Sequence, residues 1–209
     1  VGAAGSLLHS CLNYSSQIRE ADLGDFENAI NVVIQRTTQL GRFMRSFADI
    51  VKLPRPVKEP TNVLQLLEGI VSLFRAECLD RNITVSWETS AMKPIVDLDR
   101  VQMAHVFLNI VKNAIEAIDK DGEITIRCNE DMVVIEDTGT GIDPEAGKHL
   151  FTPFFSTKEF GQGIGLTLVR EVLESHKFDF SLTCEPERPT RFRIQFLALG
   201  SSGGNSFID

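Results

Sequence analysis

Hydrophobic residues recur every three or four positions over two stretches near the start of the chain, which is the period of an amphipathic helix. The first stripe is short and spans residues 6–20. The second is a heptad seam in which steps of four and three alternate, at Phe26, Ile30, Val33, Thr37, Leu40, Met44, Phe47 and Val51. Pro54 and Pro56 end it, because proline lacks an amide donor and restricts the residue before it. The pattern predicts a helical hairpin over residues 1–57.

A hairpin with one long seam cannot bury that seam by itself. The first stripe is about half as long as the second and covers only part of it. The rest must meet either a second chain or another part of this one. Closed two-fold pairs are the commonest oligomers, so we expect a homodimer through residues 6–53.

The pattern changes after the linker Lys58-Glu59-Pro60. Apolar periodicity predicts three helices and six strands, the helices over residues 62–78, 101–118 and 166–176 and the strands near residues 83–87, 94–97, 124–128, 132–135, 178–182 and 192–196. Each helix is followed by two strands. This order predicts an α+β fold, a two-layer α/β sandwich with a mixed sheet and the helices on one face. The domain would span residues 58–199, followed by a Gly/Ser-rich tail at 200–209.

The helix over residues 101–118 carries two asparagines. Its apolar stripe is expected at Val101, Ala104, Leu108, Val111, Ile115 and Ile118. Asn109 and Asn113 are four residues apart, so both project from one face of the helix. Asparagine is a poor helix former, and two on one line are unusual. Two solvated polar positions would give the same pattern, and further motifs are needed to decide.

Composition and charge exclude several classes of function. The net charge of -8 argues against a nucleic-acid-binding surface and against attraction to anionic lipid. No apolar run approaches the roughly 20 residues of a membrane helix, so we expect any membrane anchor to lie upstream and this part to be cytoplasmic. The four cysteines form no Cys-x-x-Cys pair, which favours free thiols in a reducing compartment.

Four motifs follow one another within about sixty residues. They are Asn109-x-x-x-Asn113-Ala114, Asp137-x-Gly139-x-Gly141 after a strand, Pro153-Phe-Phe-Ser-Thr-Lys158, and Gly161-x-Gly163-x-Gly165-Leu166. No Gly-Lys-Ser/Thr follows the last motif, so it is not a P-loop, and Leu166 occupies the place of the third glycine of a dinucleotide fingerprint. In this order, the motifs resemble the ATP-binding domain of sensor histidine kinases, within the gyrase, heat-shock chaperone and mismatch-repair ATPase superfamily.

The resemblance implies a site for ATP and Mg²⁺. Asn113 would be the metal ligand, and Asn109 stands where hydrolytic relatives carry a glutamate base, which an amide cannot replace. Asp137 can accept a hydrogen bond from the adenine amino group. Lys158 can place a charge on the γ-phosphate. The other expected contacts are backbone or lining positions, at Gly139, Gly141, Ile142, Phe155, Thr157, Gly161, Gln162, Gly163, Ile164, Gly165 and Leu166.

The resemblance also implies an activity and partners. The helical hairpin would dimerise into a bundle, and the γ-phosphoryl group would pass to a histidine and then to a response regulator receiver domain. The family's acceptor histidine is followed by Glu or Asp, whereas this chain has His9-Ser10, so we expect the acceptor to lie upstream. Glu116 also stands where many relatives carry a basic residue. A non-catalytic ATP-binding dimerisation or scaffold module and another superfamily ATPase or serine kinase stay open as alternatives.

Overall fold

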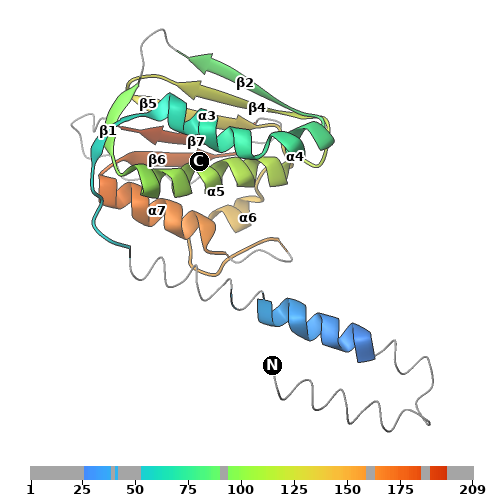
Figure 1. The fold of residues 1–209 in the computed structure, drawn as a ribbon. Coiled ribbons are helices and arrows are strands. Elements are labelled where there is room, and N and C mark those ends of the chain that lie inside the picture. Colours follow the sequence, from blue (N-terminus) through green and yellow to red (C-terminus); the bar gives the residue numbers. More distant parts are fainter. Residues whose placement is uncertain are drawn as a thin grey trace, which may run out of the picture. The chain divides into compact units, whose positions relative to one another are not determined.

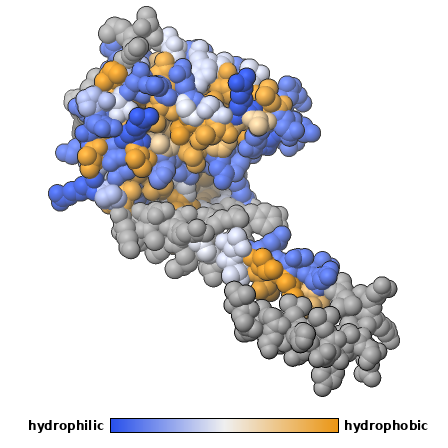
Figure 2. All heavy atoms as spheres, in the orientation of Figure 1, coloured by the Kyte–Doolittle hydropathy of each residue, from blue (hydrophilic) through white to orange (hydrophobic). Residues whose placement is uncertain are grey.

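The computed structural model describes residues 26–38, 41, 53–89, 94–158, 163–184 and 189–196. The chain divides into two compact units, Val1–Ala48 and Asp49–Asp209. In the first unit, residues 26–38 are helical, and four hydrophobic side chains there are about half exposed or more, at Phe26, Val32, Val33 and Ile34. Figure 2 shows the hydrophobic atoms of this helix gathered together, with hydrophilic atoms beside them. The remaining seam positions Leu40, Met44, Phe47 and Val51, and His9, lie outside the described residues.

The second unit is built on a five-stranded sheet with the order β2-β4-β5-β7-β6. Its strands are β2 (Ile83–Thr89), β4 (Gly122–Cys128), β5 (Met132–Asp137), β6 (Asp179–Thr183) and β7 (Thr190–Gln195). The β2–β4 pair is parallel and the other three pairs are antiparallel. The predicted mixed sheet is confirmed.

Three long helices cover one face of this sheet (Figure 1). They are α3 (Val63–Leu73), α5 (Arg100–Ala117) and α7 (Gly165–His176), with two short helices, α4 (Arg75–Asp80) and α6 (Pro144–Gly147). The core lies between the layers, where α5 residues such as Phe107 and Ile110 pack with Ile126 of β4 and Ile135 of β5. The two-layer α/β sandwich predicted from the element order is therefore confirmed. Among the described residues, we find no helix with the length and hydropathy of a membrane span.

Two local features differ from the sequence-based expectation. Residues expected to form a plain linker contain a short strand, β1 (Glu59–Asn62), which pairs antiparallel with β3 (Ile95–Leu98). The helix expected over residues 62–78 is split at Phe74 into α3 and α4. Asn62 caps α3, because its side chain accepts a hydrogen bond from the Gln65 amide at 3.1 Å.

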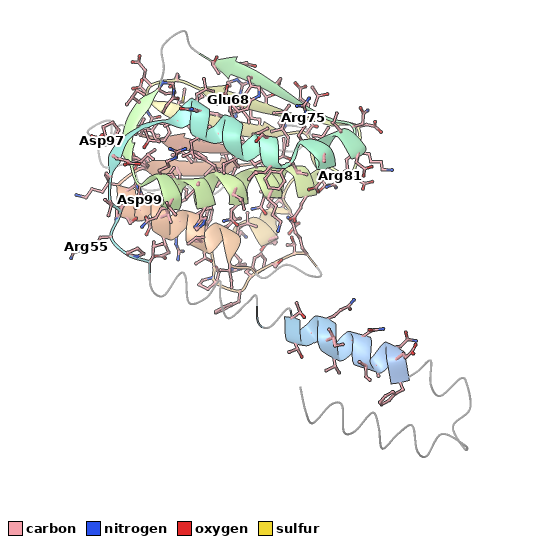
Figure 3. The ribbon with its side chains drawn as sticks, in the orientation of Figure 1. Arg55, Glu68, Arg75, Arg81, Asp97 and Asp99 are labelled. Atoms are coloured by element: carbon pink, nitrogen blue, oxygen red, sulfur yellow. The ribbon has the colours of Figure 1, made fainter. Side chains whose placement is uncertain are left out.

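Both ends of α5 are tied by charged side chains, labelled in Figure 3. Asp99 caps the first turn, where Oδ1 accepts hydrogen bonds from the amides of Val101 and Gln102, each at 3.0 Å. At the other end, Arg81 Nη2 donates to the Ile118 carbonyl at 2.6 Å. Negative charge at the start and positive charge at the end both complement the helix dipole. The helix that carries the two asparagines is thereby held at both ends.

Candidate functional site

The two asparagines of α5 lie on consecutive turns, and both are partly buried. Asn109 Nδ2 donates to the His105 carbonyl one turn earlier, at 2.8 Å. Its Oδ1 would lie 2.7 Å from a Cβ added at Gly165, the first residue of α7. The start of α7 therefore lies directly against the Asn109 side chain, which would have to shift if a larger residue replaced Gly165.

Asp137 is the last residue of β5, and its carboxyl group is buried. Side chains alternate across a strand, so Asp137 shares the helix-facing side with Val133 and Ile135, which lie in the core. Its Oδ1 accepts a hydrogen bond from the Gly139 amide at 3.0 Å. Burial raises the pKa of Asp137 to about 6, although that hydrogen bond and the charge of Lys158 act in the opposite direction.

The loop after Asp137 is fitted against the end of α5. A Cβ added at Gly139 would lie 2.6 Å from the Ala117 Cβ and 2.7 Å from the Ala117 carbonyl carbon and oxygen. The Thr140 amide donates to that same carbonyl at 3.1 Å. Gly141 has a φ of 76°, which favours glycine, and Ile142 packs against the core. The Asp137 loop is thereby fixed one turn beyond Asn113.

Lys158 reaches α5 from the segment that follows α6. Its ammonium forms an ion pair with Glu116 and donates a hydrogen bond to Asn113 Oδ1 at 3.4 Å. Earlier in the segment, the ring of Phe155 lies 5.5 Å from that of His149, and Thr157 is exposed. The predicted lysine and the predicted metal ligand are therefore brought together.

The second glycine loop touches the same segment. Gly163 has a φ of 63°, and a Cβ added there would lie 2.4 Å from the Phe154 carbonyl carbon. The Phe154 amide donates to the Gly163 carbonyl at 2.8 Å. Ile164 is buried, and Leu166 packs against the core. Gly161 and Gln162 lie outside the described residues.

Three separate segments thus contact successive turns of one helix. Gly165, at the start of α7, lies against Asn109, and Lys158 contacts Asn113. The loop after Asp137 contacts Ala117. Within the described part of the chain, Ile164 at the N-cap of α7 makes no side-chain cap, so the amide groups of the first turn can take an anion there. Along one face of α5 the chain therefore presents a carboxylate, two amides, an ammonium group and a helix N-terminus.

The donor set at Asn113 is suited to Mg²⁺ only with ligands from outside the protein. Within the described part of the chain, no group of three or more His, Cys, Asp or Glu side chains could hold a metal ion. Asn113 Oδ1 does face a cation, the Lys158 ammonium. Mg²⁺ keeps several waters and readily takes phosphate oxygens, so one amide oxygen fits that mode of binding.

Sequence reasoning missed two residues beside the Asp137 loop. Thr190 of β7 pairs directly with Asp137 in the sheet and is buried. Cys184, just after β6, has its Sγ 3.1 Å from the amide nitrogen of Ile142, which donates to it. Both belong to the last hairpin, and only the strand register brings them to the site. An alternating strand pattern alone does not reveal that register.

Comparison with known proteins identifies the family. A profile described as histidine kinase-, DNA gyrase B- and HSP90-like ATPase matches residues 98–200. The sensor protein TdiS of Thauera aromatica is 29% identical over 207 residues, which cover 91% of this chain and 37% of TdiS. Sporulation kinase A of Bacillus subtilis is 28% identical over 167 residues, covering 76% of this chain and 28% of that kinase. The chain thus spans well under half the length of these relatives.

Solved structures of histidine kinases are similar to this chain in fold. The catalytic domain of the histidine kinase ThkA has a TM-score of 0.60 and 28% identity, covering 66% of this chain and 94% of that domain. ThkA in complex with the response regulator protein TrrA has a TM-score of 0.65 at 21% identity, covering 90% and 55% of the two chains. At 21% identity, the similarity to this complex shows the fold alone. Together with the four motifs, these matches identify residues 98–200 as an ATPase domain of the histidine kinase-, DNA gyrase B- and HSP90-like family, and the chain as carrying the ATP-binding core of a sensor histidine kinase.

Proposed function

We propose that this chain binds Mg-ATP and transfers the γ-phosphoryl group to a histidine, for relay to a response regulator. One observation carries the proposal: the three motif segments meet α5 at Asn109, Asn113 and Ala117, in the order of the parts of a nucleotide. The base would lie at the Asp137 loop beside Ala117. The phosphates would lie between Asn113 and the start of α7.

Adenine would be recognised by Asp137. The ionised carboxylate accepts a hydrogen bond from the exocyclic amino group, which a guanine ring does not offer at that position. Because the carboxyl group is buried, this hydrogen bond is stronger than it would be in water. The close approach of Gly139 to Ala117 leaves the loop backbone free of side-chain bulk beside the ring.

The phosphates would be held by three groups of different kinds. The uncapped amides of α7 supply hydrogen-bond donors, and Lys158 supplies a mobile positive charge. Asn113 would hold Mg²⁺, which when bound neutralises phosphate charge. Phosphoryl transfer depends mainly on such positioning and charge stabilisation. Asn109 and Lys158 would be the residues nearest the reacting group.

Asn109 supports transfer to histidine over hydrolysis. An amide side chain does not take a proton from water near neutral pH, so a weak nucleophile such as water would lack a base here. A neutral imidazole is itself nucleophilic and needs no such base. An acceptor histidine brought in by a helical unit therefore matches the chemistry of the site.

The helical unit supports a homodimer. Phe26 and Val33 of the predicted seam are exposed in the single chain, and a second copy would cover them. The complex of ThkA with its response regulator supports a receiver domain as the second partner. Dependence on ATP supports a cytoplasmic location for this part of the protein.

The test is phosphorylation of the protein with its natural upstream residues, using ATP labelled at the γ-phosphate. We expect a label that survives base and is lost in acid, as a phosphorus–nitrogen bond requires, and that is absent with α-labelled ATP. Mg-ATP binding without any label would favour the non-catalytic scaffold. A label stable in acid would favour a serine kinase.

A further inference from the structure

Glu116 lies beside the candidate phosphate site, although its charge has the wrong sign for a phosphate ligand. It follows Asn113 by three residues on α5, so both side chains lie on the same face of the helix. The ammonium of Lys158 forms an ion pair with Glu116 and also donates to Asn113 Oδ1. One lysine is thus held between a carboxylate and the proposed metal ligand.

Among the described residues, Glu116 and Asn113 are the side chains that hold the Lys158 ammonium. Lys158 lies in an irregular segment, where its backbone amide donates to Ser156 Oγ at 3.1 Å. A four-carbon stem with three rotatable N–H donors explores many conformations unless a partner fixes its end. The Lys158 and Glu116 side chains are 45% and 34% exposed, so their ion pair adds little to the stability of the fold. Its effect is on where the ammonium lies.

The local charge balance leaves room for an anion. Lys112 Nζ approaches the other carboxylate oxygen of Glu116 at 3.6 Å, so two lysines flank one glutamate. The three side chains together carry one net positive charge. An ammonium has three N–H donors, and Glu116 and Asn113 engage two of them. Among the described residues nothing else accepts from this ammonium, so its third donor is available for a phosphate oxygen.

We propose that Glu116 is a positioning residue, whose carboxylate holds the Lys158 ammonium beside Asn113 so that the lysine meets the γ-phosphate on binding. The inference rests on the proposed function, because it assigns the γ-phosphate to this end of the site. Glu116 acts through Lys158 and does not itself touch the nucleotide. Its carboxylate therefore strengthens ATP binding, although its charge alone would repel a phosphate.

The experiment is calorimetric titration of the 209-residue chain with Mg-ATP and, separately, Mg-ADP. Glu116→Ala should weaken Mg-ATP binding by about tenfold, the scale of one charged hydrogen bond, and leave Mg-ADP binding nearly unchanged. Glu116→Gln keeps a hydrogen-bond acceptor without the charge. Its Mg-ATP affinity should lie between those of the unmutated chain and Glu116→Ala. Glu77→Gln is the matched control, since it removes a comparable exposed helix ion pair, with Arg81, away from the site. It should leave both affinities unchanged.

A double-mutant cycle separates positioning from a general effect of charge. If Glu116 acts through Lys158, then Lys158→Ala and Lys158→Ala with Glu116→Ala should bind Mg-ATP equally. Unchanged or tighter Mg-ATP binding by Glu116→Ala would overturn the inference, as would equal losses for ATP and ADP or additive losses in the cycle. If the unmutated chain does not bind Mg-ATP, the proposed function fails and this inference with it. Binding that depends on Lys158 and not on Glu116 overturns the positioning role alone.

Discussion

Two neighbouring acidic residues at the end of β5 have opposite surroundings. Glu136 is on the outer face of the sheet, in ion pairs with Arg127 and Arg191. Burial tends to raise the pKa of Glu136, but hydrogen bonds from these arginines hold it below its ordinary value. Asp137 is on the helix-facing side, where burial raises its pKa. Strand alternation thus places one carboxylate on the outer surface of the sheet and the next at the proposed nucleotide site.

The raised pKa of Asp137 predicts a pH dependence of adenine nucleotide binding. The ionised form is the better acceptor for the adenine amino group, and it is lost as the pH falls through about 6. Mg-ADP affinity should therefore fall by about tenfold at one pH unit below that pKa. Titration of Asp137→Asn in parallel removes the contribution of phosphate protonation. This variant should bind weakly at every pH, and an equally steep pH profile in it would contradict the base-reading role.

A side chain added at Gly139 should clash with α5, and the same substitution at Gly69 serves as a control. In Gly139→Ala the new methyl group would meet the Ala117 backbone, which cannot move without disturbing α5. We expect a loss of about 1–3 kcal/mol in the free energy of unfolding and weaker ADP binding. Gly69→Ala is the control, since nothing lies within 4 Å of the added Cβ on α3. It should be neutral or stabilising by up to about 1 kcal/mol. Equal behaviour of both variants in urea denaturation would contradict the close approach.

Most residues of the candidate site can be proposed from the sequence because each lies inside a compact motif. Asn113, Asp137 and Lys158 are examples, and the structure brings them to one helix face. The contact between Lys158 and Glu116 could not be predicted. It joins residues 42 positions apart through a segment of irregular structure, and no periodic pattern encodes that path.

At the scale of elements, α5 is connected to α7 and to the segment before β1. His176, at the end of α7, is buried and lies at the start of α5. Its Nε2 accepts a hydrogen bond from the Asp99 amide at 3.0 Å, while Nδ1 lies 2.8 Å from the Val172 carbonyl and donates to it. Asp99 Oδ2 accepts from the Val57 amide at 3.0 Å. One buried histidine and one cap therefore connect three elements.

This arrangement predicts that acid destabilises the fold through His176. Both ring nitrogens are engaged in the neutral form, and burial lowers the pKa of His176 below 6.5. The unfolded chain therefore takes up a proton first, and stability falls as the pH drops below about 6.5. The loss is at most about 1.4 kcal/mol per pH unit.

The measurement is urea unfolding at neutral and mildly acidic pH, for the unmutated chain and for His176→Gln. The variant should be less stable at neutral pH but lose less on acidification, because it lacks the titrating group. An identical pH dependence in both proteins would contradict the assigned role. Asp137 has the opposite effect: because its pKa is raised in the folded state, protonation of Asp137 at acidic pH stabilises the fold. This contribution is the same in both proteins and cancels in the comparison.

The α5 stripe shows how far elements can be predicted. Val111, Ile115 and Ile118 are buried as expected, whereas Val101 is 67% exposed. Met103, Val106, Phe107 and Ile110 are buried instead, because α5 lies against the sheet with α3 and α7 beside it. A helix with several neighbours buries a wide arc, and a rule based on one stripe cannot choose among overlapping stripes.

At the scale of the whole molecule, the chain combines a helical unit with a nucleotide-binding unit. The helix at residues 26–38 exposes hydrophobic side chains, while the second unit has its own core. Exposed apolar rows on a helix are typical of surfaces that pair with another chain. Phe26 and Val33 of the predicted seam are exposed, but so are Val32 and Ile34 outside it, so the seam stays a prediction.

The predicted dimer can be tested by substitutions on the seam and at a neighbouring position outside it. Ile30→Asp combined with Val33→Asp places two charges on the seam and should give monomers that still bind ADP. Val32→Asp, a neighbouring exposed position outside the seam, is the matched control and should stay dimeric. Sedimentation velocity compares both variants with the unmutated chain. A monomeric unmutated chain at micromolar concentration would contradict the predicted homodimer.

In the proposed function, the nucleotide site as a whole depends on Asn113. It is partly buried on α5 and faces a cation, so its replacement should remove a ligand without opening the core. A suitable control is Asn62→Ala, which removes the cap of α3 and should lower stability by about 1 kcal/mol without affecting nucleotide binding.

The central measurement is calorimetric titration of Mg-ATP into the unmutated chain, Asn113→Ala and Asn62→Ala, with thermal unfolding to confirm that each is folded. The unmutated chain and Asn62→Ala should bind with equal affinity. Asn113→Ala should bind at least about tenfold more weakly while unfolding at nearly the same temperature, because a metal ligand and no core contact has been removed. Unchanged Mg-ATP affinity in folded Asn113→Ala would contradict the site.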